Sequence, residues 1–400
     1  MKTILAWFMM GAAALAQTTP EVRQLARDNN TFALDLFGQL RAQPGNLFCS
    51  PYSISTALAL TAGGARGETE KQMTAALRLS LDRARLHPAC AGLQATLNKI
   101  QSSGHVRLSV ANSLWPQKKH PFLADYLDLA RRCYDVEITP QDYERAAAEA
   151  AATINKWVEQ KTQDKIKNII PPGTLDAMTR LVLVNAIYFK GNWAYPFKPD
   201  ATQPAPFKLT GGKAVEARLM NKQREYRYAA ADGVQVLELP YTGNELSMLV
   251  LLPEKADGLA ALEQALTLAR LETWTRQLRQ REVNVFLPKF KMTAKFELSR
   301  IMAALGMKDA FSGNADFSGM DGQRDLFISA ILHKAFVDVN EEGTEAAAAT
   351  AVVMRLTAIM EPEPPAVFRA DHPFLFLIRE KSTGSILFLG RVADPTQSGG

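Results

Sequence analysis

The sequence predicts a mixed fold of the α+β class, in which helices dominate the first half of the chain and strands the second. Early segments carry apolar residues at helical spacing, whereas later segments alternate or run continuously apolar, as strands do. Hydrophobic residues at 47% and charged residues at 22% describe a globular protein with an ample core. No linker, charge block or fixed-period repeat divides the 400 residues, so we expect one large domain.

The first elements are helices. A first amphipathic helix has an apolar face that consists of Phe32, Ala33, Leu36, Phe37 and Leu40. A second helix is expected to begin near Ser50-Pro51, because helices favour Ser and then Pro at their start.

The following segments mix both kinds of element. Residues 106–114 alternate as in a strand, and residues 147–163 have helical spacing. The nearly continuous apolar run 180–189 suits a strand that is buried on both faces. Residues 234–252 predict a hairpin that turns at 242–244, Thr-Gly-Asn.

The C-terminal part predicts strands on either side of a long loop. Residues 326–339 are rich in Phe, Ile and Val, and the segments 374–378 and 386–389 flank a turn at 381–384 like a hairpin. About thirty residues between these strands have no firm element of their own, a length that indicates a functional loop or a disordered segment.

The chemistry of this loop argues against disorder, because residues 346–354 contain only Ala, Thr, Val and Met. As a strand from Thr344 to Thr357, it would place Glu345 and Arg355 on one face and a small, apolar set of side chains on the other. Such a strand would span roughly 45 Å. An Ala-rich helix is the alternative that the local sequence favours.

Motifs spread along the chain resemble those of inhibitory serpins, of a secreted and prokaryotic-like type, and they occur in the same order. Examples are Asn-Leu-Phe-Cys-Ser-Pro-Tyr at 46–52 and Asn-Ala-Ile-Tyr-Phe-Lys-Gly-Asn-Trp at 185–193. The matching segments are 46–54, 63–69, 111–115, 154–158, 183–193, 287–290, 333–335, 372–374 and 388–392. The resemblance covers nearly the whole chain.

The resemblance implies a serpin fold with three β-sheets, in one domain at 17–400 with an exposed reactive-centre loop at about 341–372. It implies a monomeric suicide inhibitor, in which an extracellular serine protease attacks the loop, forms a covalent acyl-enzyme and is distorted when the cleaved loop inserts into a sheet as a strand. The native fold would then be metastable.

The resemblance also implies roles for particular residues. The hinge of the loop consists of Glu341, Glu342, Gly343, Thr344, Glu345, Ala346, Ala347, Ala348, Ala349 and Thr350. The network that controls opening of the sheet consists of Ser50, Ser53, Asn185 and His333. Trp193 and Lys289 mark the place where the loop enters, and Lys289 could pair with Glu341.

The register of the loop puts the reactive bond at Thr357-Ala358, which suits the shallow pocket of an elastase-like or subtilisin-like protease. Arg355-Leu356 is the alternative bond, for a trypsin-like protease. The rival functions are a non-inhibitory serpin that acts as carrier, storage protein or chaperone, and an extracellular hydrolase. The permissive hinge disfavours the first rival.

An enzyme is disfavoured because the chain has no G-x-S-x-G, H-E-x-x-H or phosphate-loop motif. A catalytic pair of His333 with Cys133 or with a serine stays open. The five histidines show no metal-ligand spacing, so neither a metal nor another cofactor is expected. A net charge of +5, from 46 basic and 41 acidic residues, does not favour nucleic-acid binding.

The N-terminus resembles a secretory signal peptide at 1–16, because Met-Lys-Thr precedes an apolar stretch at 4–15 that ends in Ala-Leu-Ala. We therefore expect a secreted protein, extracellular or periplasmic, without a membrane span. Three cysteines leave at least one thiol unpaired. Cys49 is expected in the core, and Cys90 and Cys133 could pair.

Overall fold

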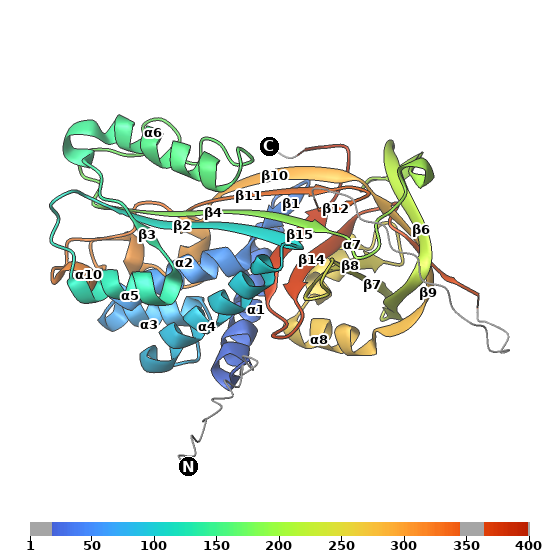
Figure 1. Ribbon diagram of the computed structural model, residues 1–400, viewed down its shortest axis with the longest axis horizontal. Coiled ribbons are helices and arrows are strands. Elements are labelled where there is room, and N and C mark those ends of the chain that lie inside the picture. The colour runs from blue at the N-terminus through green and yellow to red at the C-terminus, as the bar shows by residue number, and fades with distance from the viewer. Residues whose placement is uncertain (1–17, 345–363, 399–400) are drawn as a thin grey trace, which may run out of the picture.

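The computed structural model describes residues 18–344 and 364–398, which form helices packed against two hydrogen-bonded sheets (Figure 1). The helices are α1 (Pro20–Leu40), α2 (Pro51–Gly64), α3 (Gly67–Ala76), α4 (Arg83–Ser102), α5 (Ala124–Tyr134), α6 (Tyr143–Lys161), α7 (Leu259–Ala265), α8 (Leu268–Gln277), α9 (Ser299–Ala304) and α10 (Ser318–Asp321), with the 3-10 helices η1 (Pro199–Ala201) and η2 (Asp309–Phe311). The prediction of an α+β fold with a helical N-terminal half is confirmed.

The strands lie mainly in the second half of the chain. They are β1 (Leu47–Cys49), β2 (Val106–Pro116), β3 (Glu137–Ile138), β4 (Leu181–Asn192), β5 (Gln203–Lys208), β6 (Ala214–Ala231), β7 (Val234–Pro240), β8 (Leu246–Pro253), β9 (Arg279–Pro288), β10 (Phe290–Glu297), β11 (Leu332–Val339), β12 (Gly343–Thr344), β13 (Ala366–Arg369), β14 (Phe374–Glu380) and β15 (Ile386–Val392).

The six-stranded sheet has the order β10-β11-β12-β4-β2-β3. β2 and β4 are antiparallel partners along the whole of β2, from Val106 to Pro116. β4 and β11 run parallel and pair directly only where Asn185 to Tyr188 lie opposite His333 to Phe336. The two central strands are therefore joined directly over only a short part of their length.

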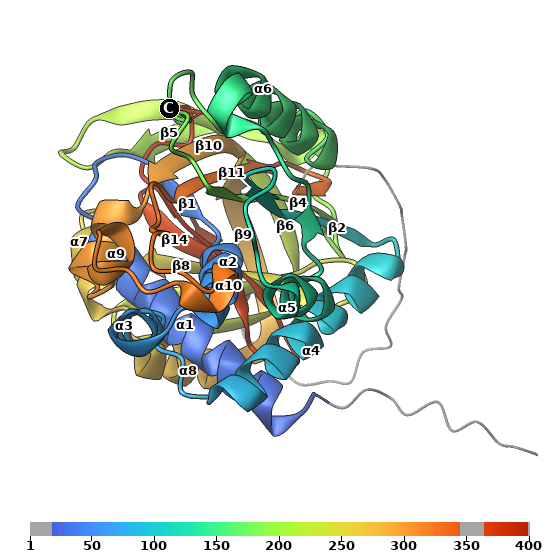
Figure 2. The same ribbon diagram turned by 90° about the vertical axis from the view of Figure 1, so that its left-hand side faces the viewer.

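α6 covers one face of this sheet, and the helices α1, α2 and α4 lie on the other side (Figure 2). Side chains of β4 alternate between the two faces, as expected for a strand buried on both. Val184, Ala186 and Tyr188 belong to the small core beneath α6, whereas Ile187 and Phe189 belong to the main core. The residues of β4 are therefore packed in place from both sides.

The nine-stranded sheet joins two of the three sheets implied by the family resemblance. Its order is β1-β15-β14-β8-β7-β6-β9-β13, and β5 pairs with β6. The long strand β6 pairs with β5 from Ala214 to Leu219, with β9 from Leu219 to Tyr228 and with β7 from Arg227 to Ala231. Because one strand passes from one group of strands into the other, the hydrogen bonding is continuous between them.

The N-terminal helices begin where the sequence indicates. The hydroxyl of Thr19 accepts a hydrogen bond from Val22 N at 3.3 Å, and Pro20 occupies the first turn of α1. Ser50 caps α2 in the same way, through a 3.2 Å bond from Ser53 N. α2 is buried on nearly every side and runs through the main core.

One predicted strand is too long. The segment 326–339 is rich in Phe, Ile and Val along its length, but β11 begins only at Leu332. The preceding residues bond elsewhere, because Ile328 N donates to Ala310 O and Ile331 O accepts from Leu298 N. The sequence left open whether Cys90 and Cys133 pair; in the structure they do not, since Cys49, Cys90 and Cys133 are all free thiols. No helix among the described residues is long and apolar enough to cross a membrane.

Candidate functional site

The candidate site begins at the end of β11, where the chain reverses direction through a tight turn. Asn340 N donates to Gly343 O at 2.9 Å, and Gly343 N donates back to Asn340 O at 3.3 Å. The side chain of Asn340 accepts a hydrogen bond from Glu342 N at 3.1 Å, a local bond that favours Asn in turns. The turn directs the chain back into the sheet as β12.

β12 lies between β4 and β11 and is antiparallel to both. Thr344 faces Gly191 of β4 on one side and Val339 of β11 on the other, and Gly343 faces Asn192. The sheet is therefore already separated at this end by the first residues of an additional strand. Further along, β4 and β11 pair directly with each other.

Close backbone contact explains the glycine at 343. A Cβ added to Gly343 would lie 2.1 Å from Gly191 O and 2.6 Å from the Cα of Asn192, both of them backbone atoms. No side chain fits in that space without moving β4. Gly343 therefore lets the chain pass between the two strands.

Thr344 is fully buried, and its hydroxyl lies 2.8 Å from the hydroxyl of Tyr241. The Tyr241 ring stacks on Trp193, with centroids 4.7 Å apart and planes 14° apart. Burial raises the pKa of Tyr241, so its hydroxyl stays protonated, and either of the two hydroxyls can donate in this bond. The hinge residue is thus held by a polar contact inside an aromatic pocket.

Glu341 fixes the turn to the rest of the molecule. Lys289 Nζ lies 2.8 Å from its Oε2, and the hydroxyl of Thr202 donates to its Oε1 at 2.9 Å. Burial alone would raise the pKa of Glu341, but hydrogen bonds from Lys289, from its own backbone and from Thr202 outweigh that effect and hold the pKa below its usual range. The carboxylate is ionised at neutral pH and binds Lys289.

The predicted loop-entry residues Trp193 and Lys289 both lie against this turn. Trp193 N donates to Glu342 O at 2.9 Å, and the indole Nε1 donates to Asn340 O at 3.0 Å. Trp193 therefore holds the turn through its backbone and its side chain, while Lys289 holds it through Glu341.

The four residues of the predicted sheet-opening network meet in a second buried cluster. Ser50 N donates to His333 Nε2 at 3.1 Å, so the proton of the neutral ring is on Nδ1, which lies 3.1 Å from Asn185 Oδ1. Asn185 Nδ2 donates to Ser53 O at 2.9 Å and also contacts the Ser53 hydroxyl. The cluster joins β4 and β11 to α2 at the first pair of their direct contact.

The sequence did not identify three members of these clusters. Asn112 of β2 accepts a hydrogen bond from Asn185 Nδ2 at 2.7 Å, and it lies opposite Asn185 in the β2–β4 register. Tyr241 and Thr202 reach the hinge from segments far away in sequence. Only Asn112 had a signal, because it belongs to one of the recognised motifs.

The remaining predicted site residues lie outside the described part of the chain. They are Glu345, Ala346, Ala347, Ala348, Ala349 and Thr350 of the hinge and the residues of both candidate reactive bonds, Arg355, Leu356, Thr357 and Ala358.

The geometry argues against catalysis by His333. Both of its ring nitrogens are engaged, by Ser50 N and by Asn185 Oδ1. The Ser50 hydroxyl donates to Leu387 O instead of to the ring. Burial raises the pKa of the Cys133 thiol, which disfavours the reactive thiolate.

Acidification is expected to weaken the cluster. Burial lowers the pKa of His333 from 6.5 to about 3. Between these values the unfolded chain binds a proton that the folded chain excludes, so stability is lost as the pH falls through this window. At pH 5 the loss is about 2 kcal/mol. The measurement is urea unfolding at pH 7 and pH 5.

The control for this prediction is a pair of variants. His333→Gln is expected to lose this part of the pH dependence, whereas His105→Gln, at an exposed position, is expected to keep it. Equal pH dependence in the native protein and His333→Gln would contradict the assignment.

The sequence and the fold both match known proteins. Residues 27–395 match the family model described as serpin (serine protease inhibitor). The leukocyte elastase inhibitor of Sus scrofa is 44% identical over 94% of this chain and 100% of its own length, and that of Homo sapiens is 43% identical over the same shares. The crystal structure of uncleaved ovalbumin has a TM-score of 0.83 at 32% identity and covers 93% of this chain and 100% of that one.

The relatives contradict the prediction of a secreted protein, extracellular or periplasmic. Leukocyte elastase inhibitors are intracellular proteins that lack signal peptides. The apolar segment 4–15 that prompted the prediction lies outside the described residues.

Proposed function

This chain belongs to the serpin family of serine protease inhibitors, and on that premise we propose that it traps its target covalently by loop cleavage and strand insertion. It is a protease inhibitor and not an enzyme. In the proposed reaction the nucleophile of the protease attacks the carbonyl of the scissile residue, the new amino terminus leaves, and an acyl-enzyme forms. The freed loop then enters the sheet and carries the protease with it.

The observation that carries this proposal is the position of β12. Thr344 is already paired with Gly191 of β4 and with Val339 of β11, in the antiparallel direction that an inserted strand would have. Insertion therefore extends an existing strand and does not have to nucleate a new one. The residues that follow would separate the direct pairs of β4 and β11 residues, which extend from His333 to Phe336.

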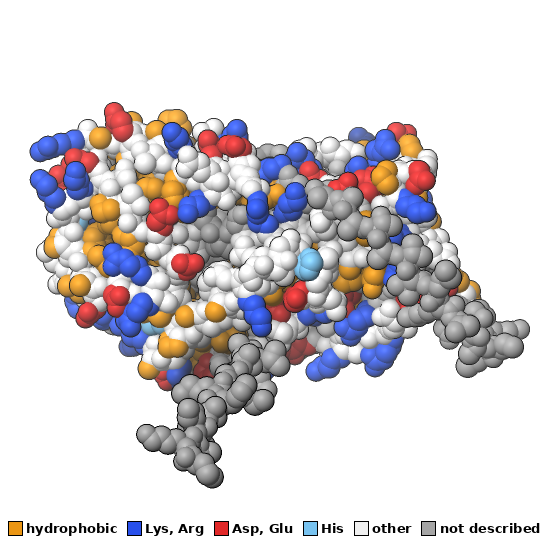
Figure 3. Space-filling model, in the orientation of Figure 1, with side chains coloured by type: hydrophobic (Ala, Val, Ile, Leu, Met, Phe, Trp, Pro, Cys, Tyr) orange, Lys and Arg blue, Asp and Glu red, His pale blue; other side chains and the backbone are white. Residues whose placement is uncertain are grey.

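The far end of the sheet offers room for such a strand. On the N-terminal side of His333 and Asn185, β11 and β4 no longer pair. An apolar pocket lies between the first residues of the two strands and is lined by residues such as Leu181, Val182, Ile328 and Leu332. Hydrophobic side chains gather at this end of the molecule, between α6 and α5 (Figure 3). Only the pairing from His333 to Phe336 then has to break before a strand can extend along the sheet.

The rival function within the family is that of a non-inhibitory serpin. The buried, small Thr344 favours the inhibitory function, because insertion meets no charge at its first step. Incubation with an elastase and denaturing electrophoresis separates the two. An inhibitor leaves a detergent-resistant adduct, whereas a non-inhibitory serpin leaves only cleaved chain and active protease.

We propose an elastase-like target, with Thr357-Ala358 as the reactive bond. Two independent observations support this target: the names of the relatives, leukocyte elastase inhibitors, and the small β-branched residue that the register places at the bond. We further propose one domain at 17–400, with its loop at about 341–372, that acts as a monomer. The main core, which extends through the helices and both sheets, supports one domain.

The reactive bond can be tested by mass spectrometry. An elastase-like enzyme is expected to form a stable adduct and to release a C-terminal peptide that begins at Ala358. Trypsin is expected to cut at Arg355-Leu356 without being trapped, because the inserting segment is then two residues, or about 7 Å, shorter. A peptide that begins at Leu356 or Glu361 after elastase treatment would overturn this register.

A variant controls for the alternative bond. Arg355→Gln is expected to abolish cleavage by trypsin at this bond and to leave the elastase adduct unchanged. Loss of the elastase adduct in this variant would assign the reactive bond to Arg355-Leu356.

A further inference from the structure

His120, Asp321 and Asp325 come together at the end of the molecule opposite the hinge. One ligand atom from each residue lies within 4.8 Å of the other two. We propose that they bind a divalent cation of the zinc class and that the cation clamps the six-stranded sheet closed. The binding site stands on its own geometry, whereas the clamp rests on the proposed function.

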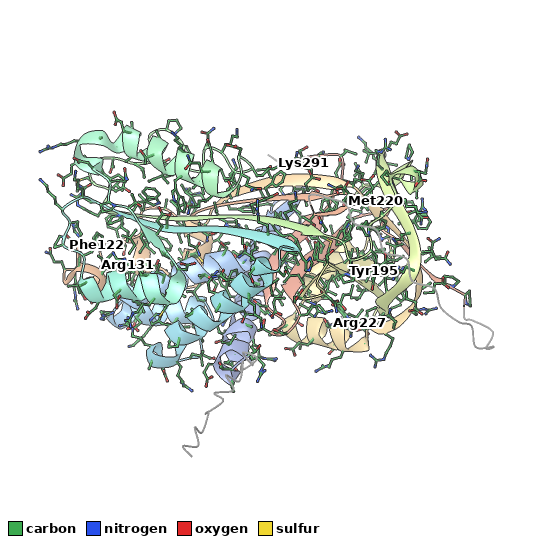
Figure 4. All side chains as sticks on the ribbon, viewed as in Figure 1. Phe122, Arg131, Tyr195, Met220, Arg227 and Lys291 are labelled. Carbon is green, nitrogen blue, oxygen red and sulfur yellow. The ribbon has the colours of Figure 1, made fainter. Side chains whose placement is uncertain are left out.

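The three side chains come from two segments far apart in sequence. His120 follows β2, and its backbone N donates to Gln117 O at 3.1 Å. Asp321 is the last residue of α10, and Asp325 follows it on the way to β11. Both ribbon views place α10 beside α5 (Figures 1 and 2), and Phe122, two residues after His120, is at the same end (Figure 4).

Two of the three ligands are already held in position. His120 Nε2 lies 2.9 Å from Asp321 Oδ2, and the His120 ring packs against Phe122 with centroids 4.8 Å apart. The other oxygen of Asp321 accepts a hydrogen bond from Gln323 N at 2.8 Å. Bonds of this kind orient the ligands of metal sites, and the exposed Asp325 has a carboxylate oxygen within 4.8 Å of the ligand atoms of the other two.

The two carboxylates of the cluster favour a cation. The side chain of Asp321 is 0% exposed and that of His120 is 10% exposed. Within the described ranges, no Lys or Arg forms an ion pair with Asp321 or Asp325, and the nearby Arg324 is paired with Asp316 at 2.8 Å. A buried carboxylate without a fixed positive partner is costly, and a bound cation removes this cost.

The donor set indicates which cation. One imidazole nitrogen and two carboxylate oxygens suit zinc, at bond lengths of about 2.0–2.2 Å. Magnesium and calcium prefer sites made of oxygen alone. Histidine spacing in the sequence gave no sign of such a site, because the ligands are about two hundred residues apart.

The site joins parts of the sheet that must separate during insertion. The segment of His120 is tied to β2 and, through the bond from Gln117 N to Arg180 O, to the start of β4. Asp321 and Asp325 lie on the segment that leads into β11. One backbone bond, from Leu123 N to Met320 O at 2.7 Å, already crosses between the two segments. A bound cation would add coordination bonds between these two segments and so oppose the separation of β4 from β11.

Binding is tested with zinc chloride and the full chain by isothermal titration calorimetry. The expected result is one site, with affinity lowered at least ~10-fold in Asp325→Asn and in His120→Gln. Asp325 is exposed, so its variant tests the site without disturbing the core. Asp128→Asn, at a surface carboxylate paired with Arg132, is the matched control and is expected to bind zinc normally. Equal zinc binding by the native protein and Asp325→Asn overturns the site.

The clamp is tested by hydrogen exchange of the β4 and β11 amides with and without zinc, in the absence of any protease. Zinc is expected to slow this exchange in the native protein and not in Asp325→Asn. Zinc binding with unchanged exchange overturns the clamp. The outcome does not depend on inhibition, so the failure of a protease adduct to form counts against the proposed function and not against the site.

Discussion

Thr344→Arg is expected to convert the inhibitor into a substrate, with at least a tenfold loss of covalent adduct while cleavage of the loop continues. Thr344 is fully buried between β4 and β11, and its hydroxyl contacts Tyr241. An unpaired charge in that position costs several kcal/mol. The arginine would therefore leave the sheet, and insertion would lose the residue that starts it. Hydrolysis of the acyl-enzyme then precedes insertion.

The measurement is denaturing electrophoresis after incubation with an elastase, beside an assay of the remaining protease activity. Thr344→Ser is the matched control, because it keeps the hydroxyl that contacts Tyr241 and is expected to keep the adduct. Circular dichroism checks that the arginine variant is folded. An unchanged adduct yield would exclude Thr344 as the first residue to insert.

The order and type of the long elements followed from the sequence because they depend on local patterns. The apolar face of the first helix is buried in α1, and all of the run at 180–189 except its first residue lies within β4, packed on both faces. The N-terminal end of β11 could not be predicted from the sequence, because the residues before Leu332 are just as apolar as the strand itself. These residues form hydrogen bonds with the segments near Ala310 and Leu298 instead of with a strand, and the start of β11 depends on these bonds.

The sequence shows which residue types form the hinge, but it does not show whether the hinge is already paired with the sheet. Small residues after Gly343 indicate that a strand can form there. Whether Thr344 is already paired depends on the position of β4 and on contacts with Tyr241 and Trp193, which are a hundred or more residues away. Local patterns carry no information on such pairings, so only the three-dimensional structure reveals that Thr344 is paired with β4 and β11.

The members of the buried clusters could also be predicted only in part from the sequence. The roles of His333 and Asn185 were implied by family resemblance, whereas Asn112 became evident only through its register opposite Asn185. His120 and Asp321 are further apart still, and histidine spacing argued against a metal. Ligands from different segments form a site only through the fold.

Cleavage of the loop is expected to raise the midpoint of thermal unfolding by at least about 15 °C. At present β4 and β11 pair directly only at His333 to Phe336. Thr344 is already paired on both sides, so a strand inserted as far as Thr357 would give the thirteen residues after it new backbone partners on both sides. At about 1 kcal/mol for each net hydrogen bond, the gain is on the order of 15 kcal/mol, and each kcal/mol moves the midpoint by roughly 1–2 °C in a chain of this size.

The comparison is calorimetry of the intact protein and of protein cut within the loop by a protease that is then removed. Cleaved Thr344→Arg serves as the control and is expected to melt near the temperature of the intact protein, because its loop is cut but does not insert. Coincident melting of the intact and the cleaved native protein would refute metastability, since insertion would then release no free energy. If cleavage raises the midpoint of thermal unfolding in the native protein but not in the variant, the gain in stability comes from a strand that begins at Thr344.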